Sequence, residues 1–511
     1  MFFLKKTVEL YIMELETIIG LEIHIQLATR SKMFSPSRNS EELNEKPNHS
    51  IDVIDLGHPG TLPLINEEAV GLACTLAYAL GMSVHSHTKF DRKHYFYPDL
   101  PKGYQITQYD QPLGTQGFLI YFYPTDEGYI EKTAGFERLH LEEDTAKSFH
   151  VEGKETTIAI DHNRSGKSLV EIVTCPDFRS PKEAKAFLEE LQRVVRACGV
   201  SDAHMEKGQL RVDANISLRP KGENKLYPKT EIKNINSFRA VEKALLFQIE
   251  EQKKAWGEGN PPQCTRTVGW RDDENRTVLQ RAKETAADYR YFPDPDVPPL
   301  SLSEQFLNHR KSLVPELPTA TRKRFMSEYG LNYAAASLLT DTPYLIRFFE
   351  EVTSSLEERL SKQNDENEDI QRIAKTAYRW ISTDILNFLN ESKIDFSQIP
   401  LTVEHFSEFL SHVSKGSITA FVGHRILSKM LSDKISYSQA LEIVGGEISS
   451  EELSLEDIVS QVIQENPKQV AEYHSGKKTI FAYFLGQIMR KSKGVFDPLQ
   501  VRQLLERYLI K

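Results

Sequence analysis

The most regular hydrophobic pattern in the chain is a two-residue alternation between residues 16 and 27. Aliphatic side chains there alternate with Glu22, His24 and Gln26, which predicts a strand with one buried face and one polar face. Side chains two residues apart on a strand share a face and lie about 6.5 Å from each other. Glu22 and His24 are therefore near enough to share one metal ion or one phosphate-bearing ligand.

Three later segments repeat this alternation with charged residues on the polar side. The residues that share these polar faces are Arg211, Asp213, Asn215 and Ser217 in 209–219, Glu231 and Lys233 in 229–234, and Arg138, His140 and Glu142 in 137–142, which Glu143 and Asp144 follow. Any sheet with a solvated face shows the same alternation, so ordinary surface charges are the alternative interpretation.

One amphipathic helix is expected to pack on this sheet. Ser180 and Glu183 form an S-x-x-E capping box around Pro181, and apolar residues then recur at helical spacing as far as Cys198. Gly199 follows, as glycine commonly does after a helix. We therefore predict that Cys198 belongs to the core and is not a catalytic thiol.

The fold class expected from these patterns is α+β, followed by all-α regions. Residues 14–295 combine short strands, turns and a few helices, which predicts a domain with a mixed or antiparallel sheet. Residues 296–399 and residues 400–511 read as two all-α domains, and clustered prolines support the first boundary. Residues 1–13 form an N-terminal extension, and Met13 is an alternative start.

Composition restricts the class of protein. The 511 residues are 40% hydrophobic and 27% charged, which is typical of a soluble multidomain protein. No apolar run approaches the ~20 residues that span a bilayer, so we expect a cytoplasmic protein that does not enter a membrane. The net charge of −10 argues against a general coat of nucleic acid, although a local basic patch is compatible with it. The four cysteines have no C-x-x-C spacing, which predicts free thiols.

The C-terminal residues 475–511 are basic within this acidic chain. They contain eight Lys and Arg residues against two acidic residues. A terminal helical segment of this charge suits docking of nucleic acid, and a solvated run of charges is the alternative.

Residues 90–105 interleave cations with aromatic residues. Arg92, Lys93 and Lys102 lie among several Tyr and Phe residues, and prolines interrupt the segment, which predicts an ordered loop and not a helix. Cations beside aromatic rings suit nucleotides, because bases stack and phosphates pair with the charge. A plain structural corner is the alternative.

If the polar faces converge, they form an oxygen-rich cluster with one imidazole, consisting of Glu22, His24, Glu142, Glu143, Asp213 and Glu231. Such donors suit Mg²⁺ or Mn²⁺ better than zinc, and nearby cations would complete a phosphoryl-transfer site. We assign catalysis to Glu143, Asp213 and Lys93, and cofactor binding to Arg92, Lys102 and Arg211. Gly166-Lys-Ser168 is not a P-loop, because Asp161 stands where that motif needs glycine.

Taken together, these segments resemble the GatB family, whose members are subunits of tRNA-dependent amidotransferases. The segments that carry the resemblance, in family order, are Glu16–Leu27, Phe90–Gln105, Leu139–Ser148, Arg211–Pro220, Lys229–Asn234 and Asp288–Pro295. Gly486–Gly494 is similar to the end of the family's YqeY-like tail.

The resemblance implies a cradle domain with a kinase-like site, a helical domain and a tail that contacts tRNA. It implies an ATP-dependent carbon–nitrogen ligase of protein biosynthesis that uses ATP and Mg²⁺ to phosphorylate the side-chain carboxylate of Glu-tRNA(Gln) or Asp-tRNA(Asn). Two partner subunits are implied: GatA releases ammonia from glutamine, and GatC braces the heterotrimer. The family's metal-binding positions match the six residues of the cluster.

One departure from the family concerns zinc. Many members bind zinc through C-x-C and C-x-x-C cysteines, and the corresponding positions here are Ser35, Ser37, Asp52 and Asp55. Because all four ligands differ together, we expect no zinc.

Two other functions remain compatible with the sequence. One is a non-catalytic tRNA-binding scaffold subunit of the same complex, and the other is an independent metal-dependent hydrolase of small phosphoesters. The sequence does not decide which misacylated tRNA is the substrate.

Overall fold

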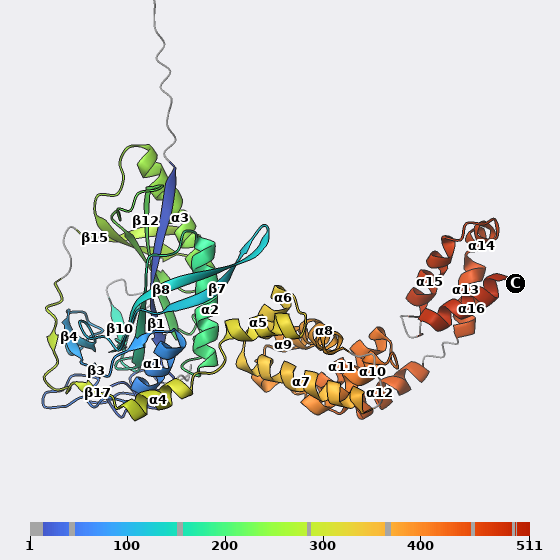
Figure 1. Cartoon of the computed structure of the whole chain (residues 1–511), viewed down its shortest axis with the longest axis horizontal. Helices are drawn as coiled ribbons and strands as arrows, with labels where there is room; N and C mark the ends of the chain where they lie inside the picture. Colours follow the sequence, from blue (N-terminus) through green and yellow to red (C-terminus); the bar gives the residue numbers. More distant parts are fainter. Residues whose placement is uncertain are drawn as a thin grey trace, which may run out of the picture. The chain divides into compact units, whose positions relative to one another are not determined.

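The computed structural model describes residues 14–39, 46–150, 157–283, 288–362, 369–450, 455–492, 496 and 498–510 (Figure 1). The expected extension over residues 1–13 lies outside the described residues. The chain divides into two compact units, Met1–Ala320 and Thr321–Lys511.

The first unit is built on a 13-stranded sheet with the strand order β15-β14-β13-β12-β1-β11-β8-β5-β4-β16, to which β2, β6 and β7 attach through β8 and β6. Among the described residues β13 and β14 are the one parallel pair, so the sheet is mixed and the expected α+β class is confirmed. The strands of this unit are β1 (Leu15–Gln26), β2 (Ser83–Val84), β3 (His87–Thr88), β4 (Asp91–His94), β5 (Tyr104–Thr107), β6 (Gly114–Thr115), β7 (Phe118–Thr125), β8 (Gly128–Glu143), β9 (Lys147–His150), β10 (Ile158–Asp161), β11 (Ser168–Thr174), β12 (Leu210–Pro220), β13 (Thr230–Ile235), β14 (Thr265–Arg271), β15 (Arg276–Lys283), β16 (Phe292–Pro293) and β17 (Leu300–Ser301).

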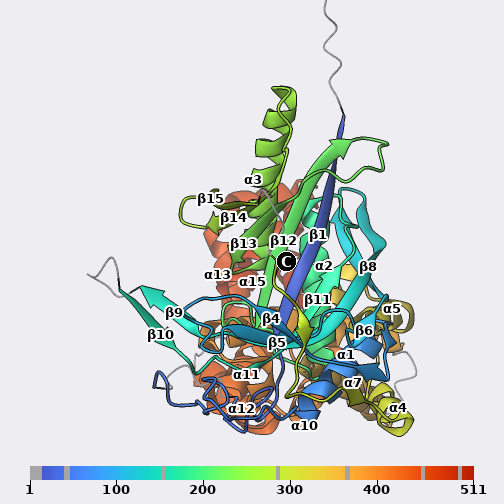
Figure 2. The ribbon, with the colours of Figure 1, turned by 90° about the vertical axis from the view of Figure 1, so that its left-hand side faces the viewer.

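Two long helices, α2 (Pro181–Ala197) and α3 (Phe238–Gly257), pack on one face of this sheet and against each other. In Figure 2 the strands β1 and β12 run in front of α2. The apolar residues that alternate along β1 and β12 are buried on the covered face, as their period of two predicted. The opposite face is therefore left for the polar side chains.

Helix α2 begins and ends where its sequence predicted. The Ser180 side chain accepts a hydrogen bond from the Glu183 backbone N–H, and Gly199 has a φ of +63° just after the helix. The return bond of the capping box differs from the prediction, because the Glu183 carboxylate accepts from the backbone N–H of Arg179. Cys198 packs against the core, and burial raises the pKa of its thiol to about 12, which fits a structural thiol.

The aromatic and basic segment 90–105 forms a hairpin with a long connection. Residues of β4 pair with β5, and residues 95–103 between these strands form the irregular loop that the sequence predicted. Alternation along β4 places Arg92 and Lys93 on opposite sides. The two cations therefore face different surroundings.

The remaining helices of the first unit are α1 (Glu67–Ala79) and α4 (Glu304–Ser312), which contact each other. Residues beyond 295 still belong to this unit, since β17 pairs with β3. The expected boundaries at 295/296 and 399/400 stay predictions, and side-chain packing groups the described residues differently.

The second unit is helical, and its buried residues form two clusters, one from Phe325 to Val444 and one from Ile458 to Leu509. The all-α character predicted for this part of the chain is confirmed in its described residues. The helices are α5 (Pro318–Glu328), α6 (Tyr333–Leu339), α7 (Pro343–Ser361), α8 (Ile370–Trp380), the π-helix η1 (Ile381–Ile385), α9 (Leu386–Ser392), the 3₁₀-helix η2 (Phe396–Gln398), α10 (Val403–Ser414), α11 (Ala420–Asp433), α12 (Tyr437–Ser450), α13 (Leu455–Glu465), α14 (Pro467–His474), α15 (Ile480–Lys491) and α16 (Pro498–Ile510).

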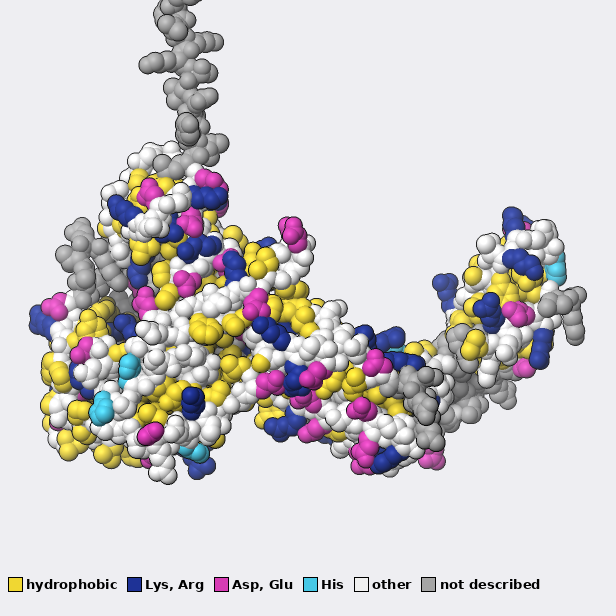
Figure 3. All heavy atoms as spheres, in the orientation of Figure 1, with side chains coloured by type: hydrophobic (Ala, Val, Ile, Leu, Met, Phe, Trp, Pro, Cys, Tyr) yellow, Lys and Arg dark blue, Asp and Glu magenta, His cyan; other side chains and the backbone are white. Residues whose placement is uncertain are grey.

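The surface of each unit is mixed in character. Figure 3 shows hydrophobic, acidic and basic side chains interspersed over the face that it presents. Of the basic residues counted in the C-terminal segment, Lys493 and Lys511 lie outside the described residues. Within the part of the chain that the structure describes, no helix combines the length and the apolar character that a membrane crossing requires.

Candidate metal site

The polar face of the sheet carries a row of four side chains across four neighbouring strands. Arg211 of β12 lies opposite His24 of β1, His24 lies opposite Glu171 of β11, and Glu171 lies opposite His140 of β8. Directly opposed residues in an antiparallel pair have Cβ atoms about 5 Å apart, so each side chain lies beside the next. The strand order therefore creates this row from residues that are far apart in the sequence.

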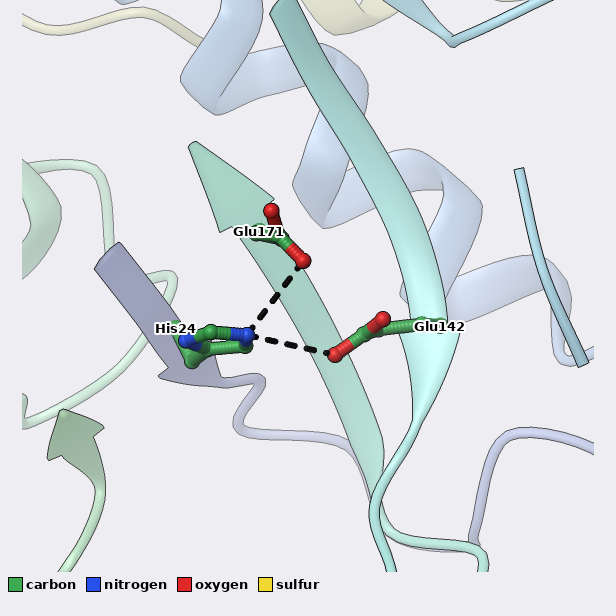
Figure 4. Close-up of side chains that lie close together, drawn as sticks. All are labelled: His24, Glu142 and Glu171. Atoms are coloured by element: carbon green, nitrogen blue, oxygen red, sulfur yellow. Dashed lines mark ion pairs between the residues drawn. The ribbon is translucent and has the colours of Figure 1, made fainter. Parts of the chain in front are cut away.

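Three residues around this row form the first carboxylate cluster. His24 Nε2 lies 3.3 Å from Glu171 Oε2 and 3.6 Å from Glu142 Oε1 (Figure 4). One potential ligand atom from each of the three side chains lies within 4.8 Å of the others. Both carboxylates are buried, so their charges are poorly screened by water.

The charges in the first cluster are strongly coupled. Burial disfavours a charged His24, but the Glu171 and Glu142 carboxylates outweigh burial and raise the pKa of His24 to about 9. Burial likewise disfavours a charged Glu171, but His140 and His24 hold the pKa of Glu171 well below its usual range. At neutral pH and without a metal, the first cluster therefore contains a cationic His24 imidazole beside an anionic Glu171 carboxylate.

Glu22, Asp213 and Glu231 form the second carboxylate cluster, again with ligand atoms within 4.8 Å of one another. Glu22 of β1 lies directly opposite Asp213 of β12. The Lys233 ammonium contacts Asp213 and lies 2.9 Å from Glu231 Oε1. Burial works against the charge of Lys233, but the two carboxylates outweigh burial and raise its pKa.

The donors of both clusters fit a hard divalent cation. Carboxylate oxygens with a single imidazole suit Mg²⁺ or Mn²⁺, which prefer oxygen ligands. In the second cluster the Lys233 ammonium already lies between Asp213 and Glu231, so a positive charge is stable there. Beside it, the buried Asn215 Oδ1 accepts no hydrogen bond from the described residues, while Asn215 Nδ2 donates to Glu22 over 3.0 Å. An oxygen acceptor without a donor is what a cation or a ligand N–H would use.

A cleft of about 380 Å³ brings parts of both clusters together. Its walls include His24 and Glu142 of the first cluster and Asp213 of the second. Lys93 also lines this cleft, with its ammonium 5.2 Å from the centroid of the Tyr289 ring, and it forms no ion pair with any residue that the structure describes. Its charge is therefore available to an anionic ligand.

Arg211 enters the same cleft but is already held by a carboxylate. Its guanidinium donates to Asp144 Oδ2 over 2.7 Å, and both residues line the cleft. Burial disfavours the charge of each, but the pairing keeps the pKa of Asp144 below and that of Arg211 above the usual value. Arg211 is therefore fixed in orientation and keeps further N–H donors for a ligand.

Glu143 belongs to neither carboxylate cluster. It follows Glu142 on β8, so its side chain points to the other side of the strand. There it pairs with the Lys102 ammonium and accepts from the backbone N–H of Ile106 over 2.9 Å. Burial raises the pKa of Glu143, and Lys102 partly offsets this effect. Two of the residues predicted for the site thus form a buried pair behind the cleft, and their roles stay predictions.

Arg92 is also engaged away from the two clusters. Its guanidinium lies 2.9 Å from Asp294 and 2.8 Å from Asp296, and 4.2 Å from the centroid of the Tyr104 ring. These contacts tie β4 to the segment around β16. Its assignment to cofactor binding stays a prediction.

Sequence reasoning missed Glu171 as a site residue. It is the one acidic residue in the otherwise aliphatic run from Leu169 to Val173, and this isolation was a usable signal. A buried carboxylate in such a run needs a charged partner. The partners, His24 and His140, become evident only from the strand order.

An α+β domain with two carboxylate clusters around one cleft has the features of a catalytic domain. Residues 17–308 match the family described as the GatB/GatE catalytic domain, and residues 360–509 match the GatB domain family. The chain belongs to the GatB family, and the resemblance noted in its sequence is confirmed.

Similar proteins cover almost the whole chain. A protein of Coxiella burnetii, named as the B subunit of an aspartyl/glutamyl-tRNA(Asn/Gln) amidotransferase, is 41% identical over 498 residues, which is 97% of this chain and 100% of that protein. Proteins with the same name from Gloeothece citriformis and Thermotoga petrophila are 39% and 40% identical, again over 97% of this chain and over 98% and 99% of their own lengths.

Proposed function

We propose that this chain is the ATP-using, tRNA-binding subunit of a tRNA-dependent amidotransferase. Its reaction is phosphorylation of the side-chain carboxylate of Glu-tRNA(Gln) or Asp-tRNA(Asn). The observation that carries the proposal is the cleft that parts of two carboxylate clusters line together with Lys93, a lysine that forms no ion pair with any described residue. The names of the similar proteins support the amidotransferase and its tRNA substrates.

The chemistry explains why such a cleft is needed. A carboxylate resists ammonia because oxide is a poor leaving group. When a carboxylate oxygen attacks the γ-phosphorus of ATP, the bond to the β,γ-bridging oxygen breaks and ADP leaves with that electron pair. Ammonia then attacks the carbonyl carbon of the acyl phosphate, inorganic phosphate leaves, and the nitrogen loses its extra proton, which gives the amide.

The two clusters would hold Mg²⁺ through His24, Glu142 and Glu171 and through Glu22, Asp213 and Glu231. Bound there, Mg²⁺ would neutralise charge on the phosphate oxygens. The same role fits Mn²⁺.

Lys93 stabilises negative charge on the phosphoryl group, because it lines the cleft and forms no ion pair with a carboxylate of the described residues. Arg211 binds and orients phosphate oxygens from a position fixed by Asp144. Lys102 and Glu143 support the wall behind them. In this proposal Arg92 positions β4, on which Lys93 lies.

Partners and location complete the proposal. Ammonia must arrive from a second subunit that hydrolyses glutamine, GatA, with GatC as the third member of a cytoplasmic heterotrimer. The basic helices α15 and α16 contact the tRNA, since Arg490, Lys491, Arg502 and Arg507 lie on them.

The test uses the three-subunit complex, ATP and each misacylated tRNA. Asp213→Ala and Glu143→Ala should reduce ADP formation and amidation by about 100-fold or more and leave tRNA affinity within about twofold. Asp273→Asn changes an exposed acid of the same domain and should match the wild type. A complex that still amidates after both substitutions would be a tRNA-binding scaffold. ATP or phosphoester hydrolysis by the isolated chain, indifferent to tRNA, would indicate an independent hydrolase.

A further inference from the structure

The turn formed by residues 52–60 lies directly against the stem of Lys102. Gly57 has a φ of +68°, and a Cβ atom on it would lie 2.5 Å from Lys102 Cγ and 3.1 Å from Lys102 Cα. No real Cβ tolerates a carbon neighbour at 2.5 Å. A glycine is therefore required at position 57 both by the backbone conformation and by the approach to Lys102.

A buried ion pair fixes this turn. The Lys32 ammonium, which is fully buried, donates to Asp55 Oδ2 over 3.0 Å and to the Ser50 carbonyl over 2.7 Å. Asp55 Oδ2 also accepts from the backbone N–H of Asp52 over 3.0 Å. A buried pair with several hydrogen bonds holds its geometry rigidly, because any displacement leaves an uncompensated charge.

The same ion pair is connected through Gly166 to Asp144, which lines the cleft. A Cβ on Gly166 would lie 2.4 Å from Asp55 Oδ1, so the two segments are in close contact. The Gly166 N–H donates to the Asp144 carbonyl over 2.9 Å, and the Asp144 carboxylate holds Arg211. The turn therefore contacts Lys102 directly, and it is connected to Arg211 through Gly166 and Asp144.

A displacement of Lys102 would also shift Glu142, which belongs to the first carboxylate cluster. The Lys102 ammonium bonds both carboxylate oxygens of Glu143, and its side chain is only 7% exposed, so it has no alternative position in solvent. Glu143 lies between Glu142 and Asp144 on the chain, and both of these neighbours line the cleft. Their backbone moves if the Lys102–Glu143 pair moves.

We propose that Gly57 is a positioning residue of the catalytic cleft: the turn that Lys32 and Asp55 fix presses Gly57 against Lys102 and so sets the Lys102–Glu143 pair behind Glu142 and Asp144. Gly57 touches no substrate and acts only through Lys102. The inference rests on the proposed function, because it concerns the phosphorylation step of that cleft.

Gly60 provides a matched control within the same turn. Its φ is +84°, and nothing lies within 4 Å of a Cβ placed on it. Gly57→Ala and Gly60→Ala therefore introduce similar backbone strain, and only the first meets Lys102. Both should lower the melting temperature of the three-subunit complex by similar amounts.

The experiment measures ADP formation, tRNA affinity and the KM for ATP in the three-subunit complex with misacylated tRNA. Gly57→Ala should lower kcat by about 100-fold, because small displacements of positioned groups cost about this much. Its tRNA affinity should stay within twofold of the wild type, and Gly60→Ala should stay within twofold in every quantity. Equal kcat values for the two variants would overturn the inference.

A double variant separates the contact with Lys102 from general damage to the turn. Lys102→Ala removes the severe contact with Cγ and leaves Cα and Cβ of residue 102 at 3.1 and 3.3 Å, which a shift of a few tenths of an ångström relieves. Adding Gly57→Ala to it should therefore change kcat by less than threefold. An undiminished effect in that background contradicts the inference. If the single variant Gly57→Ala does not assemble into the complex, the inference requires that the double variant does assemble. A double variant that does not assemble would also contradict the inference. A wild-type complex that forms no ADP with misacylated tRNA would instead refute the proposed function.

Discussion

His24 and Glu171 lie directly opposite each other on the antiparallel strands β1 and β11, with 3.3 Å between His24 Nε2 and Glu171 Oε2. Glu171 Oε2 also lies 3.4 Å from His140 Nε2, so one carboxylate contacts two imidazoles. This arrangement determines the protonation of the proposed metal ligand His24, and the first two predictions depend on it.

Binding of Mg²⁺ at the first cluster should release a proton. The pKa of His24 is about 9 without a metal, so at pH 7 the imidazole is protonated and must lose that proton to become a ligand. The apparent affinity for Mg²⁺ should therefore increase as the pH rises from 7 towards 9 and level off above it. Calorimetry of the full chain in two buffers of different ionisation enthalpy measures the proton release. His24→Gln should abolish the release, and an unchanged release would refute the assignment.

Glu171→Gln should lower the pKa of His24. Removing an opposite charge at this distance changes a pKa by about one to three pH units, and Glu142 would still keep part of the elevation. Titration of histidine-labelled full chain by NMR, without metal, gives the value directly. Glu206→Gln is the matched control, since Glu206 lies 3.2 Å from His204 and is exposed. An unaltered His24 pKa in Glu171→Gln would contradict the coupling.

Lys93→Met should impair phosphorylation selectively. The substitution keeps an apolar stem near Tyr289 and removes the charge that faces the cleft, so kcat for ADP formation should fall by about 100-fold with tRNA affinity little changed. Lys225→Met is a suitable control, because Lys225 also lies over a tyrosine ring, Tyr227, at 4.9 Å but is exposed and outside the cleft. Equal rates for the two variants would remove Lys93 from the reaction.

Phe187→Ala should destabilise the first unit by about 3–5 kcal/mol. Phe187 of α2 is fully buried and contacts the rings of Tyr121, Phe136 and Phe178, so truncation leaves a cavity between helix and sheet. Hydrogen exchange of the α2 amides reports the loss. Phe118→Ala, at a ring that is 53% exposed, should change the free energy of unfolding by less than about 1 kcal/mol. Similar losses for both would contradict the packing.

The sequence predicted the faces of the strands well because a side-chain period of two needs no knowledge of neighbours. Glu22 with His24, and Arg211 with Asp213, follow from this period alone. The same rule already separated Glu142 from Glu143, since adjacent residues on a strand point to opposite sides. The prediction grouped both with the metal ligands, and the role of Glu143 stays a prediction.

The order of the strands in the sheet could not be predicted from the sequence. The opposition of Glu171 to His24 requires β11 to lie next to β1, although about 150 residues separate the two positions. Nothing in the local pattern of either strand specifies its neighbour, because pairing depends on the packing of the whole sheet. The close approach of Gly57 to Lys102 could not be predicted either, because it also depends on how distant segments pack.

Lys233 gives the second carboxylate cluster an internal counter-ion. Three acids that converge without a cation would repel one another and would depend on a metal to fold. The Lys233 ammonium contacts both Asp213 and Glu231, so the charge of these two carboxylates is offset by a side chain of the protein itself. If Mg²⁺ binds there as proposed, it would replace a tethered amine, so binding and release of the ion need not disturb the sheet.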